Sequence, residues 1–343
     1  MRRHSRPWLN NGRAEQRANG ADACIAHVNA AGGVGGRRIL VKDRDDGYGA
    51  EQAAREIQAL IEVDQVLAVL GAFGTPTLPK VILAVDKAGV PLVGAASISD
   101  EARQPPRTWV FPVRVSAVQE ASATVKHQLT IGARRFLVLS SKEAYGPSGA
   151  AAYASALRQN GLEVQEVAFA ATDDPRQVAG RVLQAQPEVL LISVLPKPFA
   201  AVARAYRGAG GAARTFGLSV IRIEDLRTEL GPLATGICLS QPVPAPMSRT
   251  SPLASEYRQL LAKYIPGAQP SYHGLEGFLE AKVMVEGLRR AGKRPTRQLL
   301  ARALETLKGQ DFGGVHVRYS EGDRTGSTFS ELVMLGADGA LVR

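Results

Sequence analysis

The feature that most constrains this chain is an alternation of short apolar runs with amphipathic stretches that end in glycine. Glycine readily takes the left-handed conformation that ends a helix, so the stretches before Gly89, Gly161, Gly210 and Gly292 are expected to be helices. A strand, a helix, a glycine and another strand form a right-handed βαβ unit with parallel strands. We expect strands at Arg38–Val41, Val66–Leu70, Pro91–Val93, Phe136–Leu139, Val189–Val194 and Gly236–Leu239.

Two such runs follow one another, over roughly residues 13–115 and 116–243, and a proline-rich segment closes the second. Later patterns predict helices at about 250–264, 272–291 and 296–307 and strands at Val315–Tyr319 and Phe329–Leu335. Returning these helices to the first lobe makes the chain cross between lobes more than once, which favours a hinge. We therefore expect an α/β protein with two doubly wound parallel-sheet lobes, 1–116 plus 246–318 and 117–245 plus 319–343.

Composition excludes several classes of protein. The 343 residues suffice for two domains, and no run approaches the ~18 apolar residues of a membrane span. The formal charge of +10 is spread thinly and is not interleaved with aromatic residues, so we expect no nucleic-acid binding and no membrane insertion. Cys24 and Cys238 lie far apart without a histidine cluster, which argues against a metal site and favours two buried thiols.

Two strand-to-helix turns in the first lobe have the composition of a ligand site. In open parallel sheets, ligands bind beyond the carboxyl ends of the strands. In the turn after Leu70, Thr75 can cap the next helix and Pro76 suits its first position, which leaves N–H groups for an anion. A capped helix with nothing bound fits equally well. The turn after Val93 offers the hydroxyls of Ser97 and Ser99, which serve equally as plain N-caps.

A third turn, Ser140–Pro147, opens the first helix of the second lobe. Tyr145 there has an amphipathic ring suited to gripping a ligand, or it is a surface aromatic. Catalytic motifs are missing from the sequence: there is no nucleophile elbow, P-loop or HExxH. The cluster Asp43, Asp45 and Asp46 is expected to cap the helix that starts near Ala50. We expect no enzyme activity, no cofactor and no metal.

An ordered series of segments resembles one known family over nearly the whole chain, namely the type I periplasmic solute-binding proteins of ABC importers, in the leucine/isoleucine/valine-binding group. The series comprises Asn29–Ile39, Asp45–Tyr48, Leu70–Thr77, Gly89–Leu92, Trp109–Arg114, Tyr145-Gly146, Leu275–Gly277 and Val285–Gly292. The resemblance implies that the first turn holds a ligand carboxylate and that an aromatic at Tyr145 closes from the second lobe. The ligand-binding residues that we expect are Phe73, Gly74, Thr75, Ala96, Ser97, Tyr145, Ser219 and Tyr272.

The chain departs from the family at three places. Leu195-Pro196 stands where a second-lobe aromatic is common, and Ser219-Val220 stands near the acidic residue that holds an α-amino group. A buried ammonium without a carboxylate is costly, so an amide, an aromatic acid or another small carboxylate fits as well as an amino acid. The chain enters at the Ala14–Val28 helix, so we expect the first strand of lobe 1 to be missing and the N-terminus to be truncated or the gene degraded.

The function that we expect is capture of a small amino-acid-like, amide or aromatic carboxylate solute in the interlobe cleft by hinge closure. The protein would be the monomeric, periplasmic binding subunit of an ABC importer and would deliver the solute to a membrane permease. The alternative is a cytoplasmic ligand-sensing regulator of the same fold, similar to amide sensors, because the sequence has no secretion signal.

Overall fold

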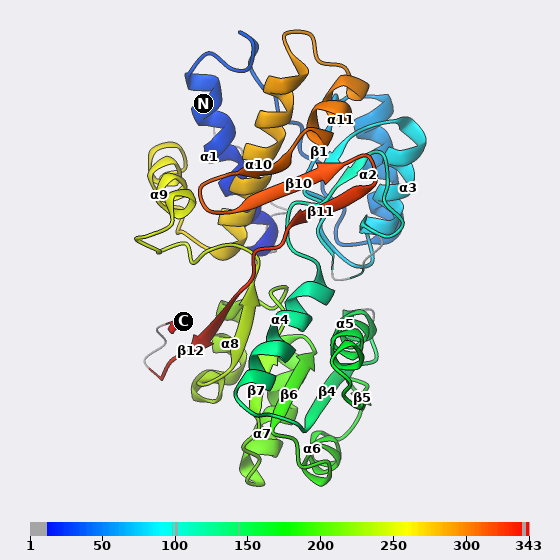
Figure 1. The fold of residues 1–343 in the computed structure, drawn as a ribbon, viewed down its shortest axis with the longest axis vertical. Helices are drawn as coiled ribbons and strands as arrows, with labels where there is room; N and C mark the ends of the chain where they lie inside the picture. Colours follow the sequence, from blue (N-terminus) through cyan, green and yellow to red (C-terminus); the bar gives the residue numbers. More distant parts are fainter. Residues whose placement is uncertain (1–11, 98, 100–101, 144, 338–340, 343) are drawn as a thin grey trace. The chain divides into compact units, whose positions relative to one another are not determined.

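A computed structural model describes residues 12–97, 99, 102–143, 145–337 and 341–342 (Figure 1). The chain divides into unit 1, Met1–Val115 with Val243–Phe329, and unit 2, Ser116–Pro242 with Ser330–Arg343. It passes from one unit to the other three times. The sequence placed the last passage after residue 318, whereas it follows Phe329, because strand β11 (Asp323–Ser327) pairs with β10 (His316–Ser320) in unit 1.

Unit 1 is built on a parallel sheet of three short strands. Its order is β1 (Val69–Leu70), β2 (Leu92–Val93), β3 (Val110–Phe111). Helix α3 (Leu78–Ala88) covers it with four buried apolar side chains and ends at Gly89 in the left-handed conformation, as predicted. Unit 1 also contains α2 (Ala50–Glu62), α9 (Pro252–Tyr264), α11 (Arg297–Glu305) and an antiparallel sheet of β9 (Lys308–Asp311), β10 and β11.

Two long helices of unit 1, α1 (Gly12–Ala30) and α10 (Tyr272–Ala291), run side by side (Figure 1, blue and gold). Glycines let their backbones touch: a Cβ added to Gly20 would lie 1.8 Å from the Gly274 carbonyl oxygen, and one on Gly277 would lie 2.1 Å from that of Arg17. Any larger side chain would force the helices apart. This close approach brings Arg17 of α1 against the acidic residues of α10.

Unit 2 contains a seven-stranded sheet in the order β13-β12-β8-β7-β6-β4-β5. The strands β4 to β8 are parallel, and β12 joins β8 antiparallel. Helices α5 to α8 connect the parallel strands, and α4 leads into β4. The bounds are α4 Ala117–Thr130, β4 Phe136–Ser141, α5 Tyr145–Gln159, β5 Gln165–Phe169, α6 Pro175–Gln184, β6 Val189–Ser193, α7 Pro196–Gly208, β7 Arg214–Gly217, α8 Ile223–Leu230, β8 Cys238–Gln241, β12 Glu331–Leu335 and β13 Leu341–Val342. The predicted α/β fold class is confirmed.

Some local predictions are wrong. Arg38–Val41 forms no strand, because the side-chain amide of Asn29 takes both backbone groups of Ile39, at 2.8 and 2.9 Å, and Leu40 is 84% exposed. Cys24 is buried as expected, but Cys238 is only half-buried. The expected missing first strand concerns residues before α1, which lie outside the described part of the chain.

Candidate functional site

The loops that follow β1 and β2 form the candidate site of unit 1. Beyond the strands they continue as a parallel pair: Phe73 bridges to Ala96, the Gly74 N–H donates to the Ala96 carbonyl at 3.0 Å, and the Ala96 N–H donates to Ala72 at 2.8 Å. The structure therefore brings Phe73, Gly74, Thr75, Ala96 and Ser97 together at the carboxyl edge of the sheet. The Gly74 and Ala96 N–H groups are thus used within the loop pair.

Three hydroxyl groups gather at this edge. The Ser97 hydroxyl donates to Thr75 Oγ1 at 3.3 Å, lies 3.1 Å from Ser99 Oγ, and accepts from the Ser99 N–H at 3.1 Å. Ser97 is 5% exposed, whereas Thr75 and Ser99 are half-buried. Hydroxyls both donate and accept, so this trio suits a carboxylate or an amide.

Thr75 is not a helix cap, contrary to expectation. The N-cap of α3 is Thr77, with Pro79 in the first turn, and the Thr77 hydroxyl donates to the Phe73 carbonyl at 3.0 Å. Helix α3 begins two residues later than the sequence suggested, because its first helical hydrogen bond joins the Leu78 N–H to the Gly74 carbonyl. The Thr75 hydroxyl is thereby released from capping.

Tyr48 packs over this loop. A Cβ on Gly74 would lie 2.7 Å from a ring carbon of Tyr48 and 2.9 Å from Thr77 Oγ1, and Gly74 has φ +127°, so only glycine fits. Tyr48 is 47% exposed, but its hydroxyl faces the loop. Burial raises the pKa of Tyr48, and a hydrogen bond from the Thr75 backbone opposes this shift. Asp45 and Asp46 accept from the Gly47 and Tyr48 N–H groups instead of capping α2.

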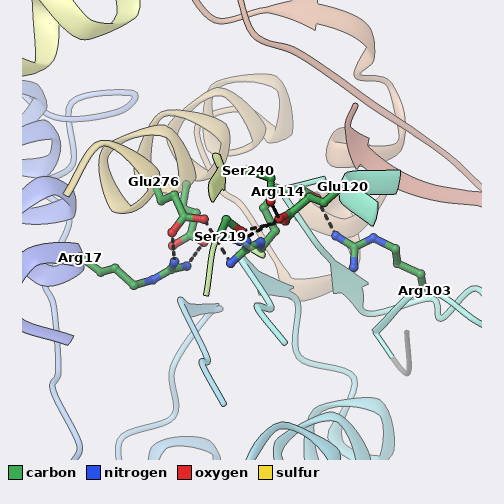
Figure 2. Close-up of polar contacts among 8 residues, drawn as sticks. Arg17, Arg103, Arg114, Glu120, Ser219, Ser240 and Glu276 are labelled. Atoms are coloured by element: carbon green, nitrogen blue, oxygen red, sulfur yellow. Dashed lines mark hydrogen bonds and ion pairs between the residues drawn. The ribbon is translucent and has the colours of Figure 1, made fainter. Parts of the chain in front are cut away.

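A buried ion-pair network lies beneath the loops of unit 1. Arg17 pairs with Glu276 at 2.7 Å and with Glu280, and Arg114 pairs with Glu276 at 3.4 Å (Figure 2). The Arg17 guanidinium also lies 5.5 Å from the ring centre of Phe73. Burial raises the pKa of Glu280 to about 7, although Arg17 opposes this shift. Such a network is fully desolvated and sensitive to the loss of any member.

Glycines place Glu280 directly under both loops. A Cβ on Gly94 would lie 2.5 Å from the Glu280 carboxyl carbon, and one on Gly71 would lie 3.5 Å from Glu280 Oε2. Tyr272, the remaining unit 1 candidate, begins α10 and is 8% exposed. Residues four apart share a helix face, so Tyr272, Glu276 and Glu280 line one side of α10.

In unit 2, Ser219 is committed to a buried carboxylate. Its N–H and hydroxyl donate to Glu120 at 3.0 and 2.8 Å, and Ser240 donates to the same carboxylate at 2.5 Å (Figure 2). Glu120 is 2% exposed and lies in the first turns of α4. Ser219 therefore holds an acid of its own unit in place.

Tyr145 lines a pocket of about 360 Å³ in unit 2. The pocket lies where β4, β5 and β6 end and where α5 and α7 begin, the position expected of ligand sites in parallel sheets. Its surface is formed by Tyr145, Ala171, Leu195 and Pro198, with Glu143 and Lys197 as its charged residues. Ser219 is not among the lining residues, so the two unit 2 candidates have separate surroundings.

Sequence reasoning missed Arg17, Tyr48, Glu120 and Glu280. The only signal for Tyr48 was its place in a segment shared with the family, and the buried acids had none. Among the described residues, no helix is both long enough and apolar enough to cross a bilayer. In that same part of the chain, no cluster of His, Cys, Asp and Glu could hold a metal ion.

Comparison with known proteins now assigns the chain to a family. The model of the family described as periplasmic binding protein matches residues 14–339. An amino acid binding protein of Pseudomonas aeruginosa is 26% identical over 158 residues, 45% of this chain and 41% of the relative. Leu/Ile/Val-binding protein homolog 8 of Brucella abortus is 26% identical over 111 residues, 32% of this chain and 27% of the relative. The matched stretches thus span less than half of either relative.

Solved structures agree over almost the full chain. A substrate-binding periplasmic protein from Ralstonia solanacearum has 28% identity and a TM-score of 0.84, covering 96% of this chain and 95% of its own. A possible leucine/isoleucine/valine-binding protein from Rhodopirellula baltica, at 24% identity and a TM-score of 0.86, covers 97% and 92% and supports the fold. The chain therefore belongs to the periplasmic binding protein family, and its fold is that of the type I periplasmic binding proteins.

Proposed function

We propose that this protein is the solute-binding subunit of an ABC importer, acts in the periplasm and catalyses no reaction. Its solute is a small carboxylate or amide, which it delivers to a membrane permease. The observation that carries the proposal is the hydroxyl trio of Ser97, Thr75 and Ser99 at the carboxyl edge of the unit 1 sheet. The Pseudomonas and Brucella relatives are named for binding amino acids, which supports a solute of this size.

The eight candidate residues have different roles under this proposal. Thr75 and Ser97 make the hydrogen bonds to the solute, and Phe73, Gly74 and Ala96 shape their loops. Tyr145 contributes its ring from unit 2, and Tyr272 extends the unit 1 surface on α10. Ser219 acts through Glu120, because both of its polar groups are used there.

Thermal unfolding with amino acids, amides and aromatic acids tests the proposal. A solute at about 100 times its Kd should stabilise the native chain by about 2.7 kcal/mol through mass action. Calorimetry should then give one solute per chain, and chromatography should recover the solute unchanged. Conversion of the solute to a product, or no stabilisation by any of the three classes, would contradict the proposal.

A further inference from the structure

Two basic segments of unit 1 that are far apart in the sequence meet beyond the ends of two helices. One segment follows α1 and the other follows α10. A Cβ added to Gly35 would lie 3.4 Å from the Cα atom of Lys293, so the two segments are in contact. The fold therefore gathers charges that the sequence spreads thinly. We call this surface the basic face, and its residues are Arg37, Arg38, Lys42, Lys293 and Arg294.

The cations of the basic face are available to a partner. All five are exposed, and none of them pairs with a carboxylate in the part of the chain that the structure describes. Of the acids beside the same loop, Asp64 is held by Arg44 at 2.7 Å, and Asp43 already has an interaction of its own. A helix C-terminus also attracts cations, but this effect is confined to the last turn, and the basic face lies beyond it.

An exposed apolar segment lies among these cations. The Asn29 side chain binds both backbone groups of Ile39, at 2.8 and 2.9 Å, and the next residue, Leu40, is 84% exposed. Val41 is exposed as well, and Lys42 follows it. The loop thus presents two arginines, then an apolar stretch, then a lysine. Apolar side chains flanked by cations are typical of surfaces that lie on an anionic membrane.

Other anionic partners fit this surface less well. A nucleic acid would bind the cations but leave Leu40 and Val41 in water, and the basic face has no aromatic ring on which a base could stack. A protein partner needs a closely complementary surface with a well-packed apolar centre. A lipid headgroup layer needs only a protruding apolar side chain with cations around it, which is what the loop provides.

The basic face lies at the edge of the unit 1 sheet opposite to the hydroxyl trio. In the segment after Arg294, the Arg297 guanidinium donates to the Val66 carbonyl at 2.9 Å and to the Ala88 carbonyl at 3.5 Å. Val66 and Ala88 precede β1 and β2, so this segment lies at the amino edge of the sheet. The hydroxyls follow the carboxyl ends of the same strands. A surface that covers the basic face therefore leaves the loops of unit 1 free.

We propose that the basic face binds an anionic phospholipid surface. The cations contact the lipid phosphates, and Leu40 and Val41 enter the headgroup layer. This association is peripheral, so it requires no helix that crosses a bilayer, and none of the described helices can do so. Each cation close to an anionic membrane strengthens binding by a factor of about five.

Vesicle sedimentation with the full chain tests the proposal. The probes are phosphatidylcholine vesicles with and without phosphatidylglycerol, which carries the negative charge. We expect binding only to the vesicles that contain phosphatidylglycerol. Raising the ionic strength from about 0.01 M to about 0.15 M should weaken it, because the Debye length falls from about 30 Å to about 8 Å.

Two variants separate the charges from the apolar side chain. The double variant Arg37→Gln and Arg38→Gln should bind about 25 times more weakly, because it loses two cations. Leu40→Ser should bind about ten times more weakly, because it loses the burial of one leucine side chain. Both changes are at exposed residues, so the fold should be kept.

Each variant has a matched control. Lys126→Gln with Arg158→Gln removes the same net charge from exposed residues of unit 2, and Leu83→Ser changes a leucine of α3 that is 67% exposed. Both controls should bind vesicles as the wild type does. Equal binding to vesicles without phosphatidylglycerol, an equal loss in a control, or unchanged binding in Leu40→Ser overturns the proposal. Tighter binding to a DNA duplex or to polyglutamate than to the vesicles also overturns it. Solute plays no part in these measurements, so their failure leaves the proposed function intact.

Discussion

Thr75 and Thr77 stand two residues apart in one loop, but their hydroxyls have different partners. Thr75 faces Ser97, whereas Thr77 donates to the Phe73 carbonyl within the loop. Thr75→Ala should weaken solute binding by about 1.5–3 kcal/mol, the value of a hydrogen bond to a charged group, and leave stability nearly unchanged. Thr77→Ala should instead lower stability by about 1 kcal/mol.

Calorimetry and urea denaturation separate these two effects. Ser97→Ala is expected to behave as Thr75→Ala does, since the two hydroxyls share one hydrogen bond. If both variants bound solute as the wild type does, the hydroxyls would have no role in recognition.

Gly94 shows how a single missing Cβ supports the site. It has φ +84°, and a Cβ there would collide with the Glu280 carboxyl carbon at 2.5 Å. Gly267, also in unit 1, has φ +89° and no atom within 4 Å of the added Cβ. Gly267→Ala should cost about 1 kcal/mol from backbone strain alone, and Gly94→Ala about 2–3 kcal/mol more from displacing a buried charge. Equal urea midpoints for the two variants would refute the collision.

The two kinds of site residue differ in how far the sequence could predict them. Thr75 and Ser97 follow strand-like runs in glycine-rich turns, so local composition is enough to place them at the carboxyl edge of the sheet. Arg17 meets Glu276 and Glu280 across 259 and 263 positions of sequence. No local pattern encodes such a distant pair; only the packing of α1 on α10 through Gly20 and Gly277 creates it.

At the scale of elements, α10 was predicted from residue 272 to 291, and the structure gives the same bounds. The contribution of α10 to the buried ion-pair network could not be predicted from the sequence. The helix is buried along most of its length, including the acidic residues Glu276 and Glu280, which a sequence pattern assigns to solvent. The predicted strand at Arg38–Val41 is wrong for a related reason. A β-branched run forms a strand only when a neighbouring strand bonds its backbone, and here the Asn29 side chain bonds the backbone of Ile39 instead.

Glu280 on α10 should make stability depend on pH. Its pKa is raised from 4.5 to about 7, so between these values the folded chain binds more protons than the unfolded chain. By linkage, the contribution to stability is fully present below about pH 4.5 and is lost as the pH rises through 7. The loss is on the order of 3 kcal/mol. Urea midpoints measured from pH 5 to pH 8 should fall accordingly.

Glu280→Gln removes this titration, so its midpoints should vary less over the same range. Glu286→Gln, a change at a half-buried glutamate in the last turns of the same helix, is the matched control and should keep the wild-type trend. A Glu280→Gln protein with the wild-type pH profile would show that Glu280 does not titrate between the folded and unfolded states.

At the scale of the whole molecule, the order of strands and helices could be predicted because βαβ connections leave few arrangements. The ends of the chain were harder to place. The sequence assigned residues 319–329 to the second lobe, whereas the β10–β11 pairing keeps them in unit 1 until Phe329. Which strand a returning segment joins depends on backbone pairing partners, and hydrophobic alternation does not identify them.

The return of the C-terminal segment to unit 2 gives the last prediction. Strand β12 pairs with β8 from Glu331 to Met334 and buries Val333 and Leu335 almost completely. Ending the chain after Phe329 removes two buried apolar side chains, worth about 1.5–3 kcal/mol each, and exposes the β8 edge. Hydrogen exchange should then quicken in β8 and β7 of unit 2 and stay unchanged in β1 to β3 of unit 1.

Within the full chain, Val333→Ala should reproduce part of the effect and Met334→Ala, at 37% exposure, little of it. Faster exchange confined to unit 1 would contradict the pairing of β12 with β8.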